Sequence, residues 1–380
     1  MLALLISLLA LAIWLYLVLG RGGFWLSSVR DTQTLAPPPG WPSVAIVVPA
    51  RDEAEGIAAS IGSLLAQDYA GTARIVLVDD GSTDDTAAIA QRAAAAAGRE
   101  SALEVVSGKP LPGGWTGKLW ALEQGIERAQ GGSPDYYLLS DADIVYAPDV
   151  LGSLVARAQA DGLVLVSLMV KLRCESIAER ALVPAFIFFF EMLYPFAWIN
   201  RRGASTAGAA GGCMLVRADA LHRIGGIECI CDALIDDCTL AAELKRVGPI
   251  RLSLTERAHS IRRYPGFQDI RRMVARSAYA QLHYSPLILL GVVGGMGLTY
   301  LAPPLFALAG VGWARLAGLA AWLLMALAFQ PTLRFYRVSP LWGIALPAIA
   351  FCYTLFTLDS ALQYARGQGG LWKGRVQARE

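Results

Sequence analysis

The chain has 380 residues, of which 55% are hydrophobic and only 17% are charged, and its formal net charge is +2. This composition is too apolar for a typical soluble enzyme, so it predicts an integral membrane protein with a sizeable soluble part. The sequence has no Lys/Arg run and no basic–aromatic stripe, and we therefore expect no nucleic acid among its partners.

The first apolar segment, residues 1–20, contains no charged residue and is long enough to span a bilayer. It lacks the basic start and the cleavage site of a signal peptide, and Arg21 and Arg30 follow it. By the positive-inside rule we expect an uncleaved N-terminal anchor whose following residues are cytoplasmic. Residues 21–42, which end in a proline-rich stretch, are predicted to be a linker.

Residues 43–285 form the predicted soluble region. Strand and helix patterns alternate in its first half: strands at 43–48, 74–78, 103–107 and 136–139, and helices at 55–67, 83–97 and 118–129. Such alternation predicts an α/β fold with a doubly wound parallel sheet. The second half is less regular, with a helix expected at 149–160 and an extended segment at 163–172.

Residues 183–199 are unusually apolar for a soluble region. If they crossed the membrane, two pairs of acidic residues discussed below would lie on opposite sides of it. We therefore predict a helix that lies on the bilayer surface.

The C-terminal region, residues 286–364, is apolar again and predicts further transmembrane helices. Residues 286–330 are expected to form two spans with a turn at 310–315, and residues 341–364 are a further candidate. Three crossings would place the basic tail, residues 365–380, outside, against the positive-inside rule. Pro347 and Asp359 allow the last segment to be re-entrant or interfacial instead, so the number of spans and the side of the C-terminus stay open.

Two acidic clusters stand directly behind predicted strands. Asp79 and Asp80 follow the strand at 74–78, whereas Asp141 and Asp143 follow the strand at 136–139. The carboxyl edge of an open α/β sheet is where ligands bind, and a divalent metal can bridge carboxylates and phosphates there. The alternative is that these acids are solvated turn residues, since Asp-Gly-Ser is common turn chemistry.

Four motifs occur in order along the soluble region: residues 47–53 (VVPARDE), 78–84 (VDDGSTD), 141–143 (DAD) and 235–237 (IDD). They resemble the ordered motifs of family 2 glycosyltransferases, which have a Rossmann-like GT-A fold. The flanking apolar segments and the tail motif at 371–375 (LWKGR) are similar to membrane-bound members that glycosylate polyisoprenoid-type lipids. The strongest resemblance, especially in residues 111–118 (LPGGWTGK), is to hopanoid-associated members. Residues 43–285 would then be a cytoplasmic GT-A domain.

The resemblance implies a nucleotide-sugar site formed by Pro49, Arg51, Glu53, Asp79, Asp80, Lys118, Asp141, Gly212 and Arg271. A carboxylate of the second motif would accept from the imide of uracil. Lys118, in a glycine-rich turn before a helix, suits a phosphate, although a plain surface loop is the alternative.

Asp141 and Asp143 match the family's DxD motif, and alternate residues at a strand end point the same way. The resemblance implies that they hold Mg²⁺ or Mn²⁺ against the diphosphate. Asp237 is the expected general base, with Asp236 as the alternative; Asp236 stands where the family carries glutamate. The two acids could also simply stabilise a helix N-terminus.

The weakest match is at residues 268–272 (QDIRR), which keep the Gln and Arg of the family's QxxRW motif but lack its tryptophan. This argues against a processive polysaccharide synthase, which remains the alternative enzyme. The predicted function is metal-dependent, inverting transfer of a sugar, from a UDP-sugar, to a hydroxyl of a membrane lipid such as a hopanoid or another isoprenoid. The expected location is the bacterial inner membrane. A non-catalytic membrane scaffold is the alternative from another class.

Overall fold

The structure is a computed structural model that describes residues 1–33 and 35–370. It forms two compact units. The helical unit comprises Met1–Ser28, Cys174–Ala197 and the chain from Tyr264 onward, and the sheet unit comprises Val29–Arg173 and Trp198–Arg263. The sheet unit begins before the expected residue 43, where Arg30 forms a bridge with Leu254, and it ends before residue 285; residues 174–197 group with the apolar helices. The tail motif at 371–375 lies outside the described residues.

The sheet unit is built on a mixed eight-stranded sheet with the order β3-β2-β1-β4-β7-β6-β8-β5. Its strands are β1 (Val44–Ala50), β2 (Ala73–Asp79), β3 (Leu103–Ser107), β4 (Tyr136–Ser140), β5 (Ile144–Tyr146), β6 (Leu165–Lys171), β7 (Cys213–Arg217) and β8 (Ile250–Ser260). The predicted parallel half is confirmed, since β3, β2, β1 and β4 pair in parallel. The other half is mixed, because β7 runs antiparallel to both β4 and β6.

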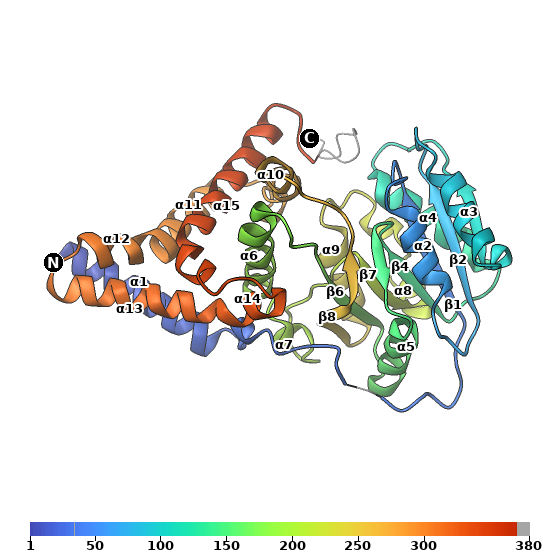
Figure 1. The fold of residues 1–380 in the computed structure, drawn as a ribbon, viewed down its shortest axis with the longest axis horizontal. Helices are drawn as coiled ribbons and strands as arrows, with labels where there is room; N and C mark the ends of the chain where they lie inside the picture. The colour runs from blue at the N-terminus through green and yellow to red at the C-terminus, as the bar shows by residue number, and fades with distance from the viewer. Residues whose placement is uncertain (34, 371–380) are drawn as a thin grey trace. The chain divides into compact units, whose positions relative to one another are not determined.

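Helices cover the sheet as the alternating pattern predicts (Figure 1). They are α2 (Ile57–Leu65), α3 (Thr86–Ala96), α4 (Gly117–Gln130), α5 (Val150–Asp161), α8 (Ala218–Arg223) and α9 (Asp236–Val247). The four helices expected at 55–67, 83–97, 118–129 and 149–160 are confirmed as α2 to α5, with differences of a few residues at their ends.

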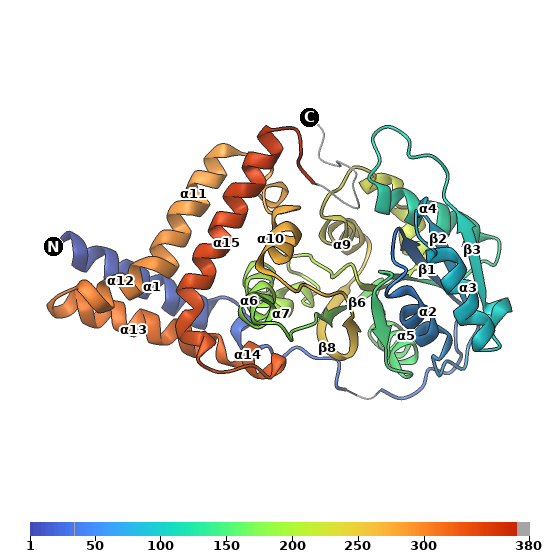
Figure 2. The same cartoon turned by 45° about the horizontal axis from the view of Figure 1, so that its top comes forward.

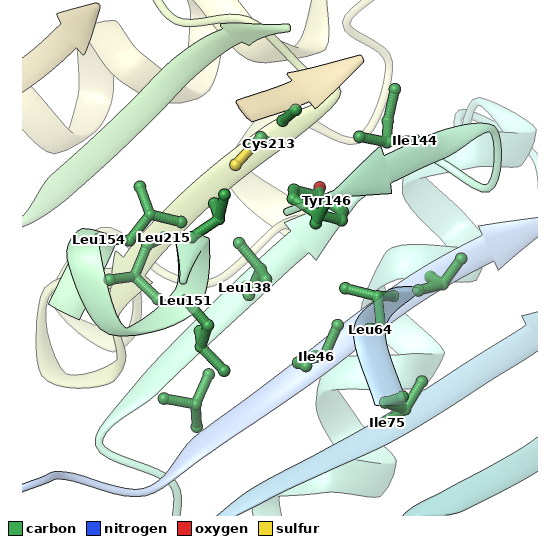
Figure 3. Close-up of a cluster of buried hydrophobic side chains, with 14 of the residues drawn as sticks. Ile46, Leu64, Ile75, Leu138, Ile144, Tyr146, Leu151, Leu154, Cys213 and Leu215 are labelled. Carbon is green, nitrogen blue, oxygen red and sulfur yellow. The ribbon is translucent and has the colours of Figure 1, made fainter. Parts of the chain in front are cut away.

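The main core lies between one face of the sheet and helices α2, α3 and α5. Ile46 of β1 and Leu138 of β4 meet Leu64 and Leu151 in this cluster (Figure 3). Val47 points to the opposite face, where an added methyl group on Gly125 of α4 would lie only 2.4 Å from its Cγ1. Strand β1 is therefore buried on both faces, which explains its continuous apolar sequence.

The strand directions bring one end of each of the eight strands to the same edge, where β6 ends because it runs parallel to β8. The parallel strands β1, β2, β3 and β4 end there, and antiparallel β7 begins there, with Ser140 opposite Cys213. Strand β8 also ends at this edge, where Ser260 pairs with Ile144 at the start of β5. Residues that follow β1, β2, β4 and β8, and those that precede β7, are thus neighbours.

The helical unit contains α1 (Leu2–Gly20), α6 (Ile177–Leu193), α10 (Phe267–Ala275), α11 (Pro286–Met296), α12 (Ala302–Ala309), α13 (Gly312–Ala328), α14 (Gln330–Tyr336) and α15 (Trp342–Ala365); the short α7 (Phe196–Ile199) crosses the unit boundary. A π-helical turn, Gly297–Leu301, joins α11 to α12. In the helical unit, α1 lies beside α13 and α11 beside α15 (Figure 2).

Four helical stretches are long and apolar enough to cross a membrane: Leu2–Gly20, Pro286–Ala309, Gly312–Tyr336 and Trp342–Ala365. They coincide with the apolar segments found in the sequence. Many of their leucines are exposed, among them Leu287 at 82% and Leu308 at 73%. An apolar surface of this kind suits lipid rather than water.

The helix expected at 183–199 is α6, which begins six residues earlier. Ser176 and Glu179 form a capping box that fixes this start, and the helix ends at Leu193. Val183 and Phe188 are fully buried, with the Phe188 ring 5.1 Å from that of Phe329. The position of α6 at a bilayer surface stays a prediction.

Candidate active site

Four aspartates gather at the shared sheet edge. Asp141 and Asp143 lie between β4 and β5, whereas Asp236 and Asp237 begin α9. Lys118, in the first turn of α4, joins the two groups because its Nζ lies 2.9 Å from both Asp141 and Asp236. The sequence places these residues up to 119 positions apart, and the fold brings them into one cluster.

The glycine-rich turn before α4 brings Lys118 to this cluster. Gly114 has a φ of +84°, which favours glycine, and the N–H of Thr116 donates to the carbonyl of Cys231 at 2.9 Å. Burial alone lowers the pKa of Lys118, but the carboxylates of Asp141 and Asp236 raise it above its ordinary value. The lysine is therefore a fixed positive charge between two acids.

Asp237 is held by two backbone donors. Its Oδ2 accepts from the N–H of Gly211 at 2.9 Å, and its Oδ1 accepts from the N–H of Cys238 at 2.7 Å. Gly211 leaves room for this arrangement, because an added methyl group there would lie 3.1 Å from Lys118 Nζ. Burial and the neighbouring Asp236 raise the pKa of Asp237 to about 6, although Lys118 and the two N–H groups oppose the shift. A carboxyl with this pKa can accept a proton near neutral pH.

Asp143 has two partners from the end of β8 that sequence analysis missed. Ser260 donates to its Oδ2 at 2.5 Å, and Arg262 Nε lies 3.3 Å from the same oxygen. Arg262 also reaches Glu53 of the first motif, with 2.6 Å between Nη2 and Oε1. The pairing of β8 with β5 places Ser260 there, and no local signal in residues 260–262 indicates this long-range contact.

The first two motifs hold each other by hydrogen bonds. Arg51 donates to the carbonyl of Asp80, and its Nη1 lies 3.9 Å from the Asp80 carboxylate. Asp79 accepts from the N–H of Ser82 at 3.0 Å and also from the Ser82 hydroxyl, which is the turn chemistry considered above. The N–H of Glu53 donates to Thr86 Oγ1 at 2.8 Å. These contacts join the loop that follows β1 to the loop that follows β2, beside the aspartate cluster.

Of the remaining predicted residues, two lie in the sheet unit and one lies in the helical unit. Pro49 is buried within β1, and Gly212 precedes β7, where its carbonyl accepts from the Tyr146 hydroxyl at 2.9 Å. Arg271 belongs to the helical unit, on α10. There its Nη1 lies 3.4 Å from Asp359 of α15, the single acid of the last apolar segment.

The carboxylate oxygens of Asp141 and Asp143 fit a divalent cation whose remaining ligands come from a bound substrate. The described residues contain no group of three His, Cys, Asp or Glu side chains able to hold a metal ion by themselves. Burial raises the pKa of Asp141, with Asp143 and Asp236 adding to the rise and Lys118 opposing it. Two crowded carboxylates such as Asp141 and Asp143 suit Mg²⁺ or Mn²⁺ when phosphate oxygens complete the coordination.

Comparison with known proteins gives consistent matches. Residues 45–225 match the family described as Glycosyl transferase family 2. An N-acetylglucosaminyltransferase of Mesorhizobium japonicum is 30% identical over 201 residues, covering 49% of this chain and 42% of that protein. An N-acetylglucosaminyltransferase of Rhizobium leguminosarum bv. viciae is 36% identical over 117 residues, covering 30% and 25%. The chain thus spans less than half the length of these relatives.

Among solved structures, a mannosyltransferase from Pyrobaculum calidifontis in complex with GDP-Man and Mn²⁺ superimposes with a TM-score of 0.60. The match covers 94% of this chain and 99% of that one, at 20% sequence identity, so the similarity is one of fold. It confirms the predicted GT-A-like α/β fold.

Proposed function

We propose that this chain, whose residues 45–225 match the Glycosyl transferase family 2 model, is a glycosyltransferase that transfers a sugar from a nucleotide sugar to an acceptor hydroxyl. The observation that supports this most strongly is the cluster of four aspartates around Lys118 at the carboxyl edge of the sheet. That edge is the ligand-binding position of open α/β sheets. The cluster offers separate groups for a cation and for a proton, both of which glycosyl transfer requires.

The donor nucleotide would lie against the first two motifs. Arg51, Glu53, Asp79 and Asp80 line one loop pair, and an ionised aspartate there is a strong acceptor for a uracil imide. A UDP-sugar is the expected donor. The names of the two bacterial relatives make N-acetylglucosamine the first sugar to test, and the GDP-Man complex makes mannose the second.

Asp141 and Asp143 would hold Mg²⁺ or Mn²⁺. When bound, the cation neutralises the negative charge that develops on the diphosphate leaving group. The ion pair with Lys118 holds Asp141 in place. The contacts with Ser260 and Arg262 hold Asp143 in place.

Asp237 is the proposed general base. The acceptor oxygen forms a bond to the anomeric carbon while the bond from that carbon to the phosphate oxygen breaks, and the acceptor proton passes to Asp237. The nucleoside diphosphate leaves, and the anomeric configuration inverts because there is a single displacement. Asp236 is a poorer base because Lys118 binds it directly at 2.9 Å, whereas Asp237 has only neutral N–H partners.

A membrane lipid is the proposed acceptor, with a hopanoid or another isoprenoid as the first candidate. The four apolar helices and their exposed leucines support attachment to a membrane, which we propose is the bacterial inner membrane, with the sheet unit in the cytoplasm. A polysaccharide synthase is the alternative enzyme, and a non-catalytic scaffold is the alternative without chemistry.

The test is a transfer assay in membranes that contain the protein. Labelled UDP-N-acetylglucosamine, UDP-glucose, UDP-galactose or GDP-mannose is supplied with Mn²⁺ and a bacterial lipid extract that contains hopanoids. Label in one organic-extractable lipid, made by the wild type and by Asp232→Asn but absent with Asp237→Asn, is the expected result. Asp232 is a matched control because it is exposed and lies in the same segment. Label only in polymer would instead favour a synthase, and no label with any donor would favour the scaffold.

A further inference from the structure

A polar cavity lies at the opposite edge of the sheet from the aspartate cluster, where strand β8 begins. Its volume is about 530 Å³. The end of α5 and the start of β8 line it, with Asp161, Asn200, Arg202 and Arg251 as its main polar residues. None of these residues belongs to the proposed transfer site.

Arg251 is the unusual group in this cavity. Its guanidinium is partly buried and makes no hydrogen bond or ion pair with any other residue in the described part of the chain. It also borders a smaller hollow that contains Arg30, Arg157 and Arg257. Burial and the neighbouring Arg157 both lower the pKa of Arg251, and Asp161 opposes them. A positive charge held in this way is short of negative partners.

Two carboxylates line these hollows, and both already pair with other arginines: Asp31 lies 2.9 Å from Arg257 Nη2, and Asp161 pairs with Arg157. Arg157 Nη1 lies 3.2 Å from Asp161 Oδ2, and its Nη2 donates to Gln33 Oε1 at 2.9 Å. Arg202 donates to the backbone carbonyl of Asp161 at 2.9 Å. The arginines that line the two hollows therefore outnumber the carboxylates, and the surplus charge is positive.

We propose that this cavity binds a phosphate group, with the guanidinium of Arg251 as its principal ligand and Arg202 as its second. Guanidinium groups bind phosphate oxygens through paired, charge-assisted hydrogen bonds. The phosphate belongs either to an anionic phospholipid headgroup or to a soluble phosphate compound.

The experiment measures the thermal unfolding midpoint of the full chain in neutral detergent. Inorganic phosphate is titrated in one series and short-chain phosphatidylglycerol in the other, because a ligand that binds only the folded state raises the midpoint. Wild type is compared with Arg251→Gln and with Arg99→Gln, an exposed arginine elsewhere in the sheet unit. We expect Arg251→Gln to fold with an unchanged midpoint without ligand, since it loses no partner, and to need about tenfold more ligand for a given shift.

The shifts of the unfolding midpoint distinguish the two sources of the phosphate and test the proposed site. Shifts with both ligands that depend on Arg251 support a phosphate site open to soluble compounds, and a shift only with the lipid supports a headgroup site. Equal shifts in all three proteins, or no shift in wild type, would overturn the proposal. If Arg251→Gln does not fold, Arg202→Gln tests the same cavity from an exposed position. Sugar transfer plays no part in this readout, so the proposal and the proposed function can fail separately.

Discussion

Replacing Lys118 with methionine should destabilise the sheet unit in a pH-dependent way. The lysine is 20% exposed and lies 2.9 Å from both Asp141 and Asp236, so methionine removes the shared cation and leaves the two carboxylates facing each other. Breaking a buried ion pair by removing one partner costs about 3 kcal/mol or more. For a unit of about 200 residues this corresponds to a fall of about 6 to 12 °C in the unfolding midpoint.

The pH dependence has a definite sign. Burial already raises the pKa of Asp141 above its ordinary value, and removing Lys118, which opposes this rise, should raise it further. A carboxyl with a raised pKa favours the folded state at low pH, and this contribution is lost as pH rises through the folded pKa. The loss should therefore grow as pH rises from the acid to the neutral and mildly alkaline range.

The assay is thermal unfolding of the full chain in detergent over this pH range. Lys109→Met is the matched control, because Lys109 and its partner Glu127 are each 63% exposed and such pairs contribute under about 1 kcal/mol. Mn²⁺ should stabilise Lys118→Met more than wild type, since it replaces the missing positive charge. A Lys118→Met midpoint equal to that of Lys109→Met at every pH would refute the reasoning.

Two further predictions concern the aspartate cluster, and a third concerns the packing of α4 on β1. Transfer, measured as kcat/KM, should rise with pH through an apparent pKa of about 6, because Asp237 must be ionised to accept a proton; a flat profile between about pH 5 and 8 would contradict this. Arg262→Gln should tighten Mn²⁺ binding without nucleotide, measured by calorimetry, because Asp143 loses a cationic partner; unchanged affinity would remove Arg262 from the metal site. Gly125→Leu should destabilise the sheet unit by about 3 kcal/mol, because its Cβ meets Val47 at 2.4 Å; a midpoint equal to wild type would show that α4 can move away.

The first half of the sheet was predictable because its signals are local. Continuous apolar runs identified β1, β2 and β4, and the acids that follow β2 and β4 are found where those strands end. In parallel strands this places Asp79 and Asp141 at one edge, so a ligand site at that edge could be expected from these two residues.

The second half was not predictable because its order depends on long-range pairing. β7 inserts antiparallel between β4 and β6, and β8 brings Ser260 and Arg262 to Asp143 across more than a hundred residues. Lys118 was expected to contact a phosphate, and the structure pairs it with two carboxylates instead; whether it also reaches a donor phosphate stays a prediction. The capping box of Ser176 and Glu179 sets the start of α6. It lies before the apolar run, so the apolar pattern alone predicts a start six residues too late.

The most direct test of the account separates donor binding from turnover in Asp237→Asn. The full chain in detergent is titrated with UDP-N-acetylglucosamine and Mn²⁺ by calorimetry, and transfer to extracted lipid is measured on the same samples. The account predicts a donor Kd within about twofold of wild type and a loss of turnover of about a hundredfold or more, because Asp237 acts on the acceptor proton only. Turnover that survives at the wild-type rate would contradict the assignment of Asp237 as the base.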